Sequence, residues 1–176
     1  MTSRVLVGGL AALSCALAAA PAHGASRALR PSADFSVSAA QPTRNYGAAE
    51  RLVVRRRPLA RAFVRFALPA ALAPGERAVL WIYPLRDSRA GLVLRHASDV
   101  PWREHEVTFA DAPRTGPRAV RSGPLRRDRW QALDVTSLTN ASRAVSLALA
   151  TTGATAVVLT SRESAPWLTT GSRALT

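Results

Sequence analysis

The chain has 176 residues and a formal net charge of +13, and all 24 of its basic residues are Arg. Its length suits one hydrophobic core of ordinary size, and its single Cys excludes a fold held together by internal disulfides.

The first segment, residues 1–24, has the features of a secretory signal peptide. MTSR carries one positive charge and precedes the apolar run VLVGGLAALSCALAAA, which is too short to span a bilayer. Ala22 and Gly24 supply the small residues that a signal peptidase requires, so cleavage is expected after Gly24. The sequence therefore predicts a secreted, extracellular protein without a transmembrane segment. The alternative is a lipoprotein lipidated at Cys15, although Ala12 stands where a lipobox usually has Leu.

The excess of Arg indicates which class of molecule the protein attracts. A strongly basic exported surface attracts polyanions such as acidic polysaccharides, cell-wall polymers or lipid surfaces. Nucleic acid is not expected, because the chain is exported and carries no recognisable nucleic-acid-binding motif. Arg without Lys, with abundant Ala, Pro and Gly, is also typical of GC-rich codons, so part of the charge need not reflect a ligand.

Residues 25–31 are expected to form a short leader, residues 32–170 a single domain and residues 171–176 a tail. Within the domain, strand-like runs alternate with turn residues, and helical periodicity is almost absent. The runs include RAFVRFAL, RAVLWIYPL, GLVLRHAS, RAVRSGPL, RWQALDVTSL, AVSLALATT, AVVLTSRES and PWLTT. Many short strands without helices predict an all-β fold, an antiparallel sandwich or barrel.

Two of these runs show a clear two-residue period. In RAFVRFAL, Phe66 lies on the apolar face, whereas Phe63 and Arg65 point the other way. In RAVLWIYPL, Trp81 and Tyr83 lie opposite the apolar face. The pattern therefore predicts aromatic rings on outward-facing surfaces.

The domain carries, in order, ADFSVS, NYG, RLVVRR, AFVRFAL, AVLWIY, WREHEVTF with a following AP, WQALDVTSL and SRES. This order and spacing resemble the DNRLRE domain, also classed as carbohydrate-binding module family 96. The resemblance extends over about Ser32 to Thr170. It implies an antiparallel β-sandwich of jelly-roll type and a secreted, non-catalytic module that binds an extracellular polysaccharide, which the Arg excess suggests is acidic.

The resemblance implies structural roles for the residues that match the family's signature. Their polar members are expected to tie turns and strand ends together by charge-assisted hydrogen bonds. These residues are Asp34, Asn45, Tyr46, Gly47, Phe66, Trp102, Glu104, Asp134, Arg162 and Glu163. The chain departs from the family at Ala67, where an Asp is usual, and at Trp81, where an Arg is usual.

The segment PWREHEVTF, residues 101–109, raises the question of a catalytic or metal-binding cluster. Its His-Glu pair resembles the opening of a zinc motif, but Phe109 occupies the position of the second His. The resemblance implies a structural segment instead, with Trp102 packed on the sandwich and Val107 and Phe109 on a strand. A structural calcium ion at Asp34 and Glu163 is left open, and no other cofactor is expected.

The sequence gives little support for an arrangement of catalytic residues. No Gly-x-Ser-x-Gly nucleophile elbow occurs. A glycosidase would need paired carboxylates, and four are close in sequence: Asp99, Glu104, Glu106 and Asp111. Loop carboxylates are usually solvated or paired with Arg, however. A small polysaccharide lyase, the least favoured function, would draw on Tyr83, His96 and Arg95.

Binding remains as the expected activity. Sugar-binding modules present aromatic rings to the apolar faces of pyranoses and Arg forks to the carboxylates of acidic sugars. The candidate residues for this surface are Trp81, Tyr83, Phe63 and Arg65. Trp102 and Trp130 are instead expected to pack in the core or at its rim. The alternative function is a structural or adhesive protein of the cell envelope or matrix, in which these aromatic rings are buried or matched to a partner.

Overall fold

The computed structural model describes residues 27–140, 142–162 and 167–171. The expected signal peptide, Cys15 and Glu163 lie outside these residues, as does nearly all of the expected tail. Among the described residues, no helix is long and apolar enough to cross a membrane.

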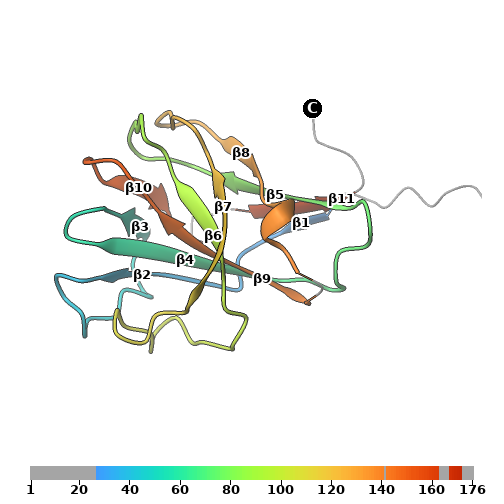
Figure 1. The fold of residues 1–176 in the computed structure, drawn as a ribbon, viewed down its shortest axis with the longest axis horizontal. Helices are drawn as coiled ribbons and strands as arrows, with labels where there is room; N and C mark the ends of the chain where they lie inside the picture. Colours follow the sequence, from blue (N-terminus) through green and yellow to red (C-terminus); the bar gives the residue numbers. More distant parts are fainter. Residues whose placement is uncertain (1–26, 141, 163–166, 172–176) are drawn as a thin grey trace, which may run out of the picture.

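The described chain is all-β, as predicted, apart from one turn of 3-10 helix, η1 (Thr136–Leu138). Figure 1 shows the strands in their sequence colours. They are β1 (Arg27–Leu29), β2 (Ala33–Ser38), β3 (Arg51–Val54), β4 (Ala60–Ala67), β5 (Arg77–Ile82), β6 (Val93–Ala97), β7 (Thr115–Arg121), β8 (Gln131–Asp134), β9 (Ala144–Ala150), β10 (Val157–Thr160) and β11 (Trp167–Gly171).

The strands build a two-layered antiparallel sandwich (Figure 1). One layer is a five-stranded sheet in the order β2-β4-β9-β6-β7. The other joins a four-stranded sheet, β1-β11-β5-β8, to the pair β10-β3. The Leu85 N–H donates to the Val158 carbonyl at 2.8 Å, which connects β10 to the chain just after β5. Most connections pass from one layer to the other, as in the expected jelly roll.

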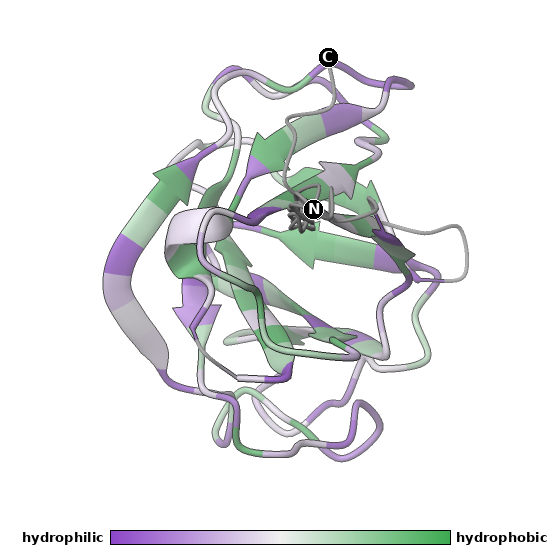
Figure 2. Ribbon diagram, turned by 90° about the vertical axis from the view of Figure 1, so that its right-hand side faces the viewer, coloured by the Kyte–Doolittle hydropathy of each residue, from purple (hydrophilic) through white to green (hydrophobic). Residues whose placement is uncertain are grey.

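The main core lies between the layers, and the predicted alternation of β4 and β5 is confirmed. Ala62, Val64 and Phe66 of β4 are buried, as are Leu80 and Ile82 of β5. Because successive strand residues point to opposite faces, each layer contributes every second residue to this core. Figure 2 shows the hydrophobic colour concentrated on the central strands and the hydrophilic colour on many of the peripheral loops.

A second hydrophobic cluster lies on the outer face of the five-stranded sheet. Phe35 of β2 and Phe63 of β4 are fully buried there and stack with ring centroids 4.9 Å apart. The loop of residues 98–114 covers them, and its Trp102 meets Phe35 edge-on at 4.7 Å. The sheet is therefore buried on both faces near β2 and β4.

Two boundaries differ from the sequence predictions. Arg27–Leu29, expected in a leader, forms β1 and pairs with β11, so the fold begins before residue 32. Val107 and Phe109, expected on a strand, lie in a loop. The backbone there is held by contacts outside any strand ladder: the Phe109 N–H donates to the Pro42 carbonyl at 3.0 Å, and the Asn45 side chain donates to the Val107 carbonyl at 2.7 Å.

Candidate functional site

The four residues predicted to form a sugar platform lie on two different layers. Phe63 and Arg65 belong to β4 in the five-stranded sheet, whereas Trp81 and Tyr83 belong to β5 and the residues after it, in the opposite layer. The prediction of one shared surface is therefore wrong. β4 and β5 follow each other in sequence, but the chain between them crosses the sandwich instead of forming a hairpin.

Phe63 and Arg65 belong to the covered outer face of their sheet. Phe63 has no exposed surface, so the expectation that its ring is open to a ligand is wrong. The Arg65 guanidinium lies 5.9 Å from the centroid of the Trp102 ring and donates to the Asp99 carbonyl at 3.5 Å. Both residues therefore hold the loop of residues 98–114 against the sheet.

Trp81 and Tyr83 share a different surface with Trp130, and we call these three residues the aromatic stripe. Trp81 and Tyr83 are half-buried, and Trp130 is 40% exposed. The Tyr83 and Trp130 rings meet edge-on with centroids 5.3 Å apart. The Trp81 indole N–H donates to Thr169 Oγ1 at 3.2 Å, which fixes the orientation of this ring.

Strand register explains why the stripe assembles. Ile82 on β5 pairs with Gln131 on β8, so the next residues along the two strands, Tyr83 and Trp130, come together. Trp81 lies two residues from Tyr83, hence on the same face. Trp130 was expected to pack in the core or at its rim, and it lies at the rim with much of its ring exposed. Sequence reasoning did not include it in the candidate site, because the register of β5 and β8 is not encoded in either strand alone.

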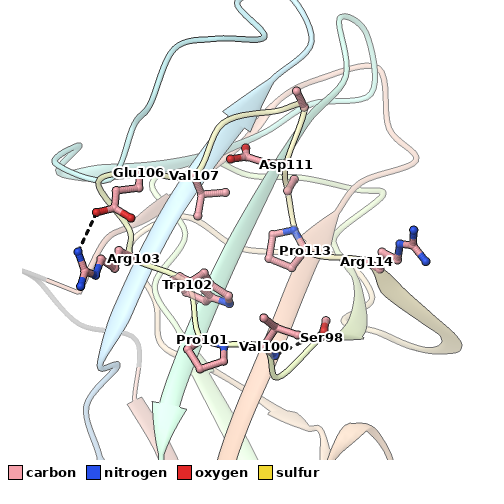
Figure 3. Close-up of a pocket in the computed structure, with 12 residues that line it drawn as sticks. Ser98, Val100, Pro101, Trp102, Arg103, Glu106, Val107, Asp111, Pro113 and Arg114 are labelled. Carbon is pink, nitrogen blue, oxygen red and sulfur yellow. Dashed lines mark hydrogen bonds and ion pairs between the residues drawn. The ribbon is translucent and has the colours of Figure 1, made fainter.

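A hollow of about 670 Å³ lies along the loop of residues 98–114 (Figure 3). Its lining comes from this loop alone and includes Trp102, Val107 and Pro113. Arg103 and Glu106, at one side of the view, form an ion pair at 3.1 Å. The hollow thus belongs to the segment PWREHEVTF and its continuation, whose apolar residues pack on the sheet.

Asn45 fastens this loop to the turn that precedes β3. Its side-chain N–H group donates to the carbonyls of Glu104 at 2.6 Å and Val107 at 2.7 Å, and its side-chain oxygen accepts from the Gly47 N–H at 2.9 Å. A Cβ on Gly47 would stand 2.1 Å from the Glu104 carbonyl oxygen, so only glycine fits there. The Asn-Tyr-Gly turn is therefore built for close contact with the loop.

The buried Asp34 and Glu104 and the partly exposed Arg162 form a polar network. The Glu104 carboxylate accepts from the Asp34 N–H at 3.1 Å and pairs with the Arg162 guanidinium at 2.9 Å. The Asp34 carboxylate accepts from the Arg162 N–H at 2.6 Å. His105 also lies 3.2 Å from the Glu104 carboxylate, on its exposed side. Glu163, the remaining acidic signature residue, lies outside the described residues.

The remaining signature residues that the structure describes lie in different parts of the fold. Phe66 is fully buried in the main core. Tyr46 lies half-buried in its turn, with its hydroxyl bonded to Gln41. Asp134, at the end of β8, accepts hydrogen bonds from Thr136 and Arg77. Burial alone would raise the pKa of Asp134, but the hydrogen bonds from Thr136 and Arg77 outweigh it and lower this pKa to about 2.

The carboxylates considered for a glycosidase are each engaged by a partner of their own. Asp99 accepts from Asn140 at 2.6 Å, Glu106 pairs with Arg103, and Glu104 belongs to the network described above. Hydrogen bonds from Thr108 lower the pKa of Asp111, whereas a general acid needs a raised one. The residues considered for a lyase are also separated, because Tyr83 lies in one layer and Arg95 and His96 in the other.

No three His, Cys, Asp or Glu side chains within the described ranges are grouped so as to hold a metal ion. The Asp34 carboxylate accepts a backbone N–H, and its proposed calcium partner Glu163 is not described. Calcium at Asp34 and Glu163 therefore stays an open prediction.

A family model for carbohydrate-binding module family 96 matches residues 25–169. The chain belongs to this family. The match begins before β1 and ends within β11, so the family 96 domain includes the first strand that sequence reasoning had assigned to a leader. No curated protein matches the chain significantly. Membership of family 96 indicates a carbohydrate-binding module.

Proposed function

We propose that this family 96 module is exported, has no catalytic centre and binds an extracellular polysaccharide through the aromatic stripe. The observation that carries the proposal is the pairing of Tyr83 with Trp130, whose ring is 40% exposed beside the half-buried Trp81. Rings held in a fixed orientation on a sheet offer flat apolar surfaces, which suit the apolar faces of pyranose rings at little entropic cost.

The charge of the chain supports an acidic polysaccharide as the ligand. The formal net charge is +13, and Arg126, Arg127 and Arg129 precede Trp130 on the turn that leads into β8. These three side chains are exposed, although Arg127 is paired with Asp128 at 2.9 Å. Arg next to an aromatic surface can bind a sugar carboxylate while the ring contacts the sugar face.

The proposed lack of catalysis rests on the separation of the reactive side chains. The loop carboxylates are engaged by Asn140, Arg103, Arg162 and Thr108, and the residues considered for a lyase lie in different layers. A structural or adhesive role would instead use the stripe to contact a partner protein, and the binding experiment below separates it from glycan recognition.

The test is affinity electrophoresis of the purified protein in gels that contain neutral or acidic polysaccharides. Trp81→Ala and Trp130→Ala should each lower the affinity for the bound polysaccharide, as measured from the retardation in the gel, at least about tenfold. This is the loss expected when one stacked ring is removed. Val100→Ala is the matched control, because Val100 is an apolar residue, 68% exposed, in the loop that covers the opposite layer. Equal retardation of all variants would contradict the stripe as the binding surface.

A further inference from the structure

The turn between β3 and β4 carries three successive arginines and an apolar residue pair, and we call it the hairpin tip. Its residues, all of them exposed, are Arg55, Arg56, Arg57, Pro58 and Leu59. The Arg55 N–H donates to the Ala60 carbonyl at 3.0 Å and the Ala60 N–H to the Arg55 carbonyl at 2.9 Å, which closes the turn. Figure 1 shows this turn at the left end of the molecule.

The three arginine side chains of the hairpin tip are not neutralised by the protein. None of them forms an ion pair or a side-chain hydrogen bond with a described residue, whereas Arg77, Arg103 and Arg162 all pair with carboxylates. The nearest acidic residue in the sequence, Glu50, precedes the other end of β3. The guanidinium donors of the tip are therefore available to a ligand.

The segments on both sides of the hairpin tip also lack acidic side chains. On one side, the Ala39 N–H donates to the Leu59 carbonyl at 2.8 Å, and residues 39–49 include no Asp or Glu. On the other side, Val157 of β10 pairs with Val54, so the residues before Val157 run beside the tip. Residues 151–156, TTGATA, carry no charge.

A fourth arginine lies next to this uncharged loop. Arg89 is exposed and lines one cavity together with Gly153 and Thr155. Asp87 lines the same cavity, and its carboxylate accepts a hydrogen bond from the Arg127 N–H at 2.7 Å. The end of the molecule around the tip therefore has a positive balance.

We infer that the hairpin tip docks the module on an anionic lipid surface. Guanidinium groups match phosphate oxygens with paired hydrogen bonds, and clustered arginines are attracted to anionic headgroups. Leu59 is 37% exposed beside Pro58, so the same turn offers an apolar side chain to the boundary between headgroups and acyl chains. A soluble polyanion would satisfy the arginines but offers no apolar phase to Leu59. The surface shares no residue with the aromatic stripe and is independent of the proposed polysaccharide binding.

The experiment measures co-sedimentation of the purified protein with lipid vesicles at about 0.1 M salt, where the Debye length is about 10 Å. One set of vesicles is phosphatidylcholine alone, and the other contains phosphatidylcholine and phosphatidylglycerol in a ratio of about 2 to 1, which gives an anionic surface. Soluble polyphosphate is tested separately by calorimetry, because it offers phosphate without a lipid phase. The double variant Arg56→Gln/Arg57→Gln removes two cations from the tip.

Arg30→Gln/Arg143→Gln is the control with the same change of charge. Both arginines are exposed and lie near the end of β4 that is distant from the tip. The Arg143 carbonyl accepts from the Leu68 N–H, just after β4, and Arg30 lies two residues before Ser32, whose N–H donates to the Arg65 carbonyl.

The wild-type protein should bind the anionic vesicles and leave the neutral ones unbound. The tip variant should lose at least about tenfold in affinity for the anionic vesicles, and the control variant less than about twofold. Leu59→Ser should weaken binding at least about threefold, because it removes the apolar contact and keeps every charge. Thermal unfolding of each variant checks that the fold is intact.

Three results would overturn the inference. Equal losses in the tip and control variants would mean that overall charge is responsible. Equal binding to neutral and anionic vesicles would mean that the arginines do not recognise the headgroups. Binding of polyphosphate that depends on the tip, with no binding to either kind of vesicle, would assign the tip to a soluble phosphate polymer. In each case the proposed polysaccharide binding is decided by its own electrophoresis experiment.

Discussion

The Glu104 carboxylate accepts a hydrogen bond from the backbone N–H of Asp34, a residue 70 positions earlier in the chain, at 3.1 Å. The same carboxylate pairs with Arg162, whose own N–H donates to Asp34. Three distant parts of the chain, β2, the loop of residues 98–114 and the segment after β10, are thus joined at one point. The described residues contain no Cys, so no disulfide joins these parts. This network fixes the loop that covers the second hydrophobic cluster.

Glu104→Ala should lower the free energy of unfolding by about 2 kcal/mol, because it leaves the buried Asp34 N–H without its acceptor and removes the ion pair with the partly exposed Arg162 guanidinium. Glu106→Ala, two residues along the same loop, is the control. Its side chain is 65% exposed and pairs with an exposed Arg103, so the cost should be below about 1 kcal/mol. Urea denaturation measures both, and similar losses for the two variants would refute the structural role of Glu104.

Asn45→Asp should destabilise the protein by about 2 kcal/mol or more although the two side chains have nearly the same shape. The amide donates to two carbonyls, those of Glu104 and Val107, and a carboxylate would face them without a proton. Asn45→Ala should cost about as much. Urea denaturation compares the two variants, and a stable Asn45→Asp protein would show that these contacts do not hold the loop.

Trp102→Ala should cost about 3 kcal/mol, because the ring packs edge-on against Phe35 over the second cluster. Trp102→Phe should cost only about 1 kcal/mol, since the buried Trp102 indole N–H has no hydrogen-bond partner among the described residues and little is lost with it. Chemical denaturation of both variants checks the order. A Phe variant as unstable as the Ala variant would mean that the indole N–H has an essential partner.

Asp134 should make the free energy of unfolding decrease as the pH falls into the acid range. Its pKa in the folded protein is about 2, below the unfolded value of about 3.9, so its contribution is present above pH 3.9 and is lost as the pH falls toward 2. The carboxylate is 42% exposed, so the contribution is about 0.5–1 kcal/mol after solvent screening. Asp134→Asn should remove this part of the pH dependence between pH 5 and 2 in denaturation experiments, and an unchanged profile would argue against it.

The alternation of residues in the strands was sufficient to predict an all-β fold and the main core, and the family resemblance added that the fold is a sandwich. Ala62, Val64, Phe66, Leu80 and Ile82 are buried, as their two-residue period requires. The period does not determine which strands are neighbours, however. β4 and β5 alternate equally clearly, but they belong to different layers, and this separates Phe63 and Arg65 from Trp81 and Tyr83.

The candidate site depended on two further features that the sequence pattern does not contain. The contact between Tyr83 and Trp130 follows from the register of β5 against β8, and the burial of Phe63 follows from the path of the loop of residues 98–114.

The most direct test of the central claim is the binding of wild-type and Trp81→Ala protein to a panel of neutral and acidic polysaccharides at low and high salt. If the aromatic stripe recognises sugars, the wild-type protein retains binding to at least one polysaccharide at about 0.5 M salt, where charge contacts are screened, and Trp81→Ala loses it. Binding to every polyanion that disappears at high salt, equally in both proteins, would contradict recognition by the stripe and leave only the attraction of an Arg-rich surface.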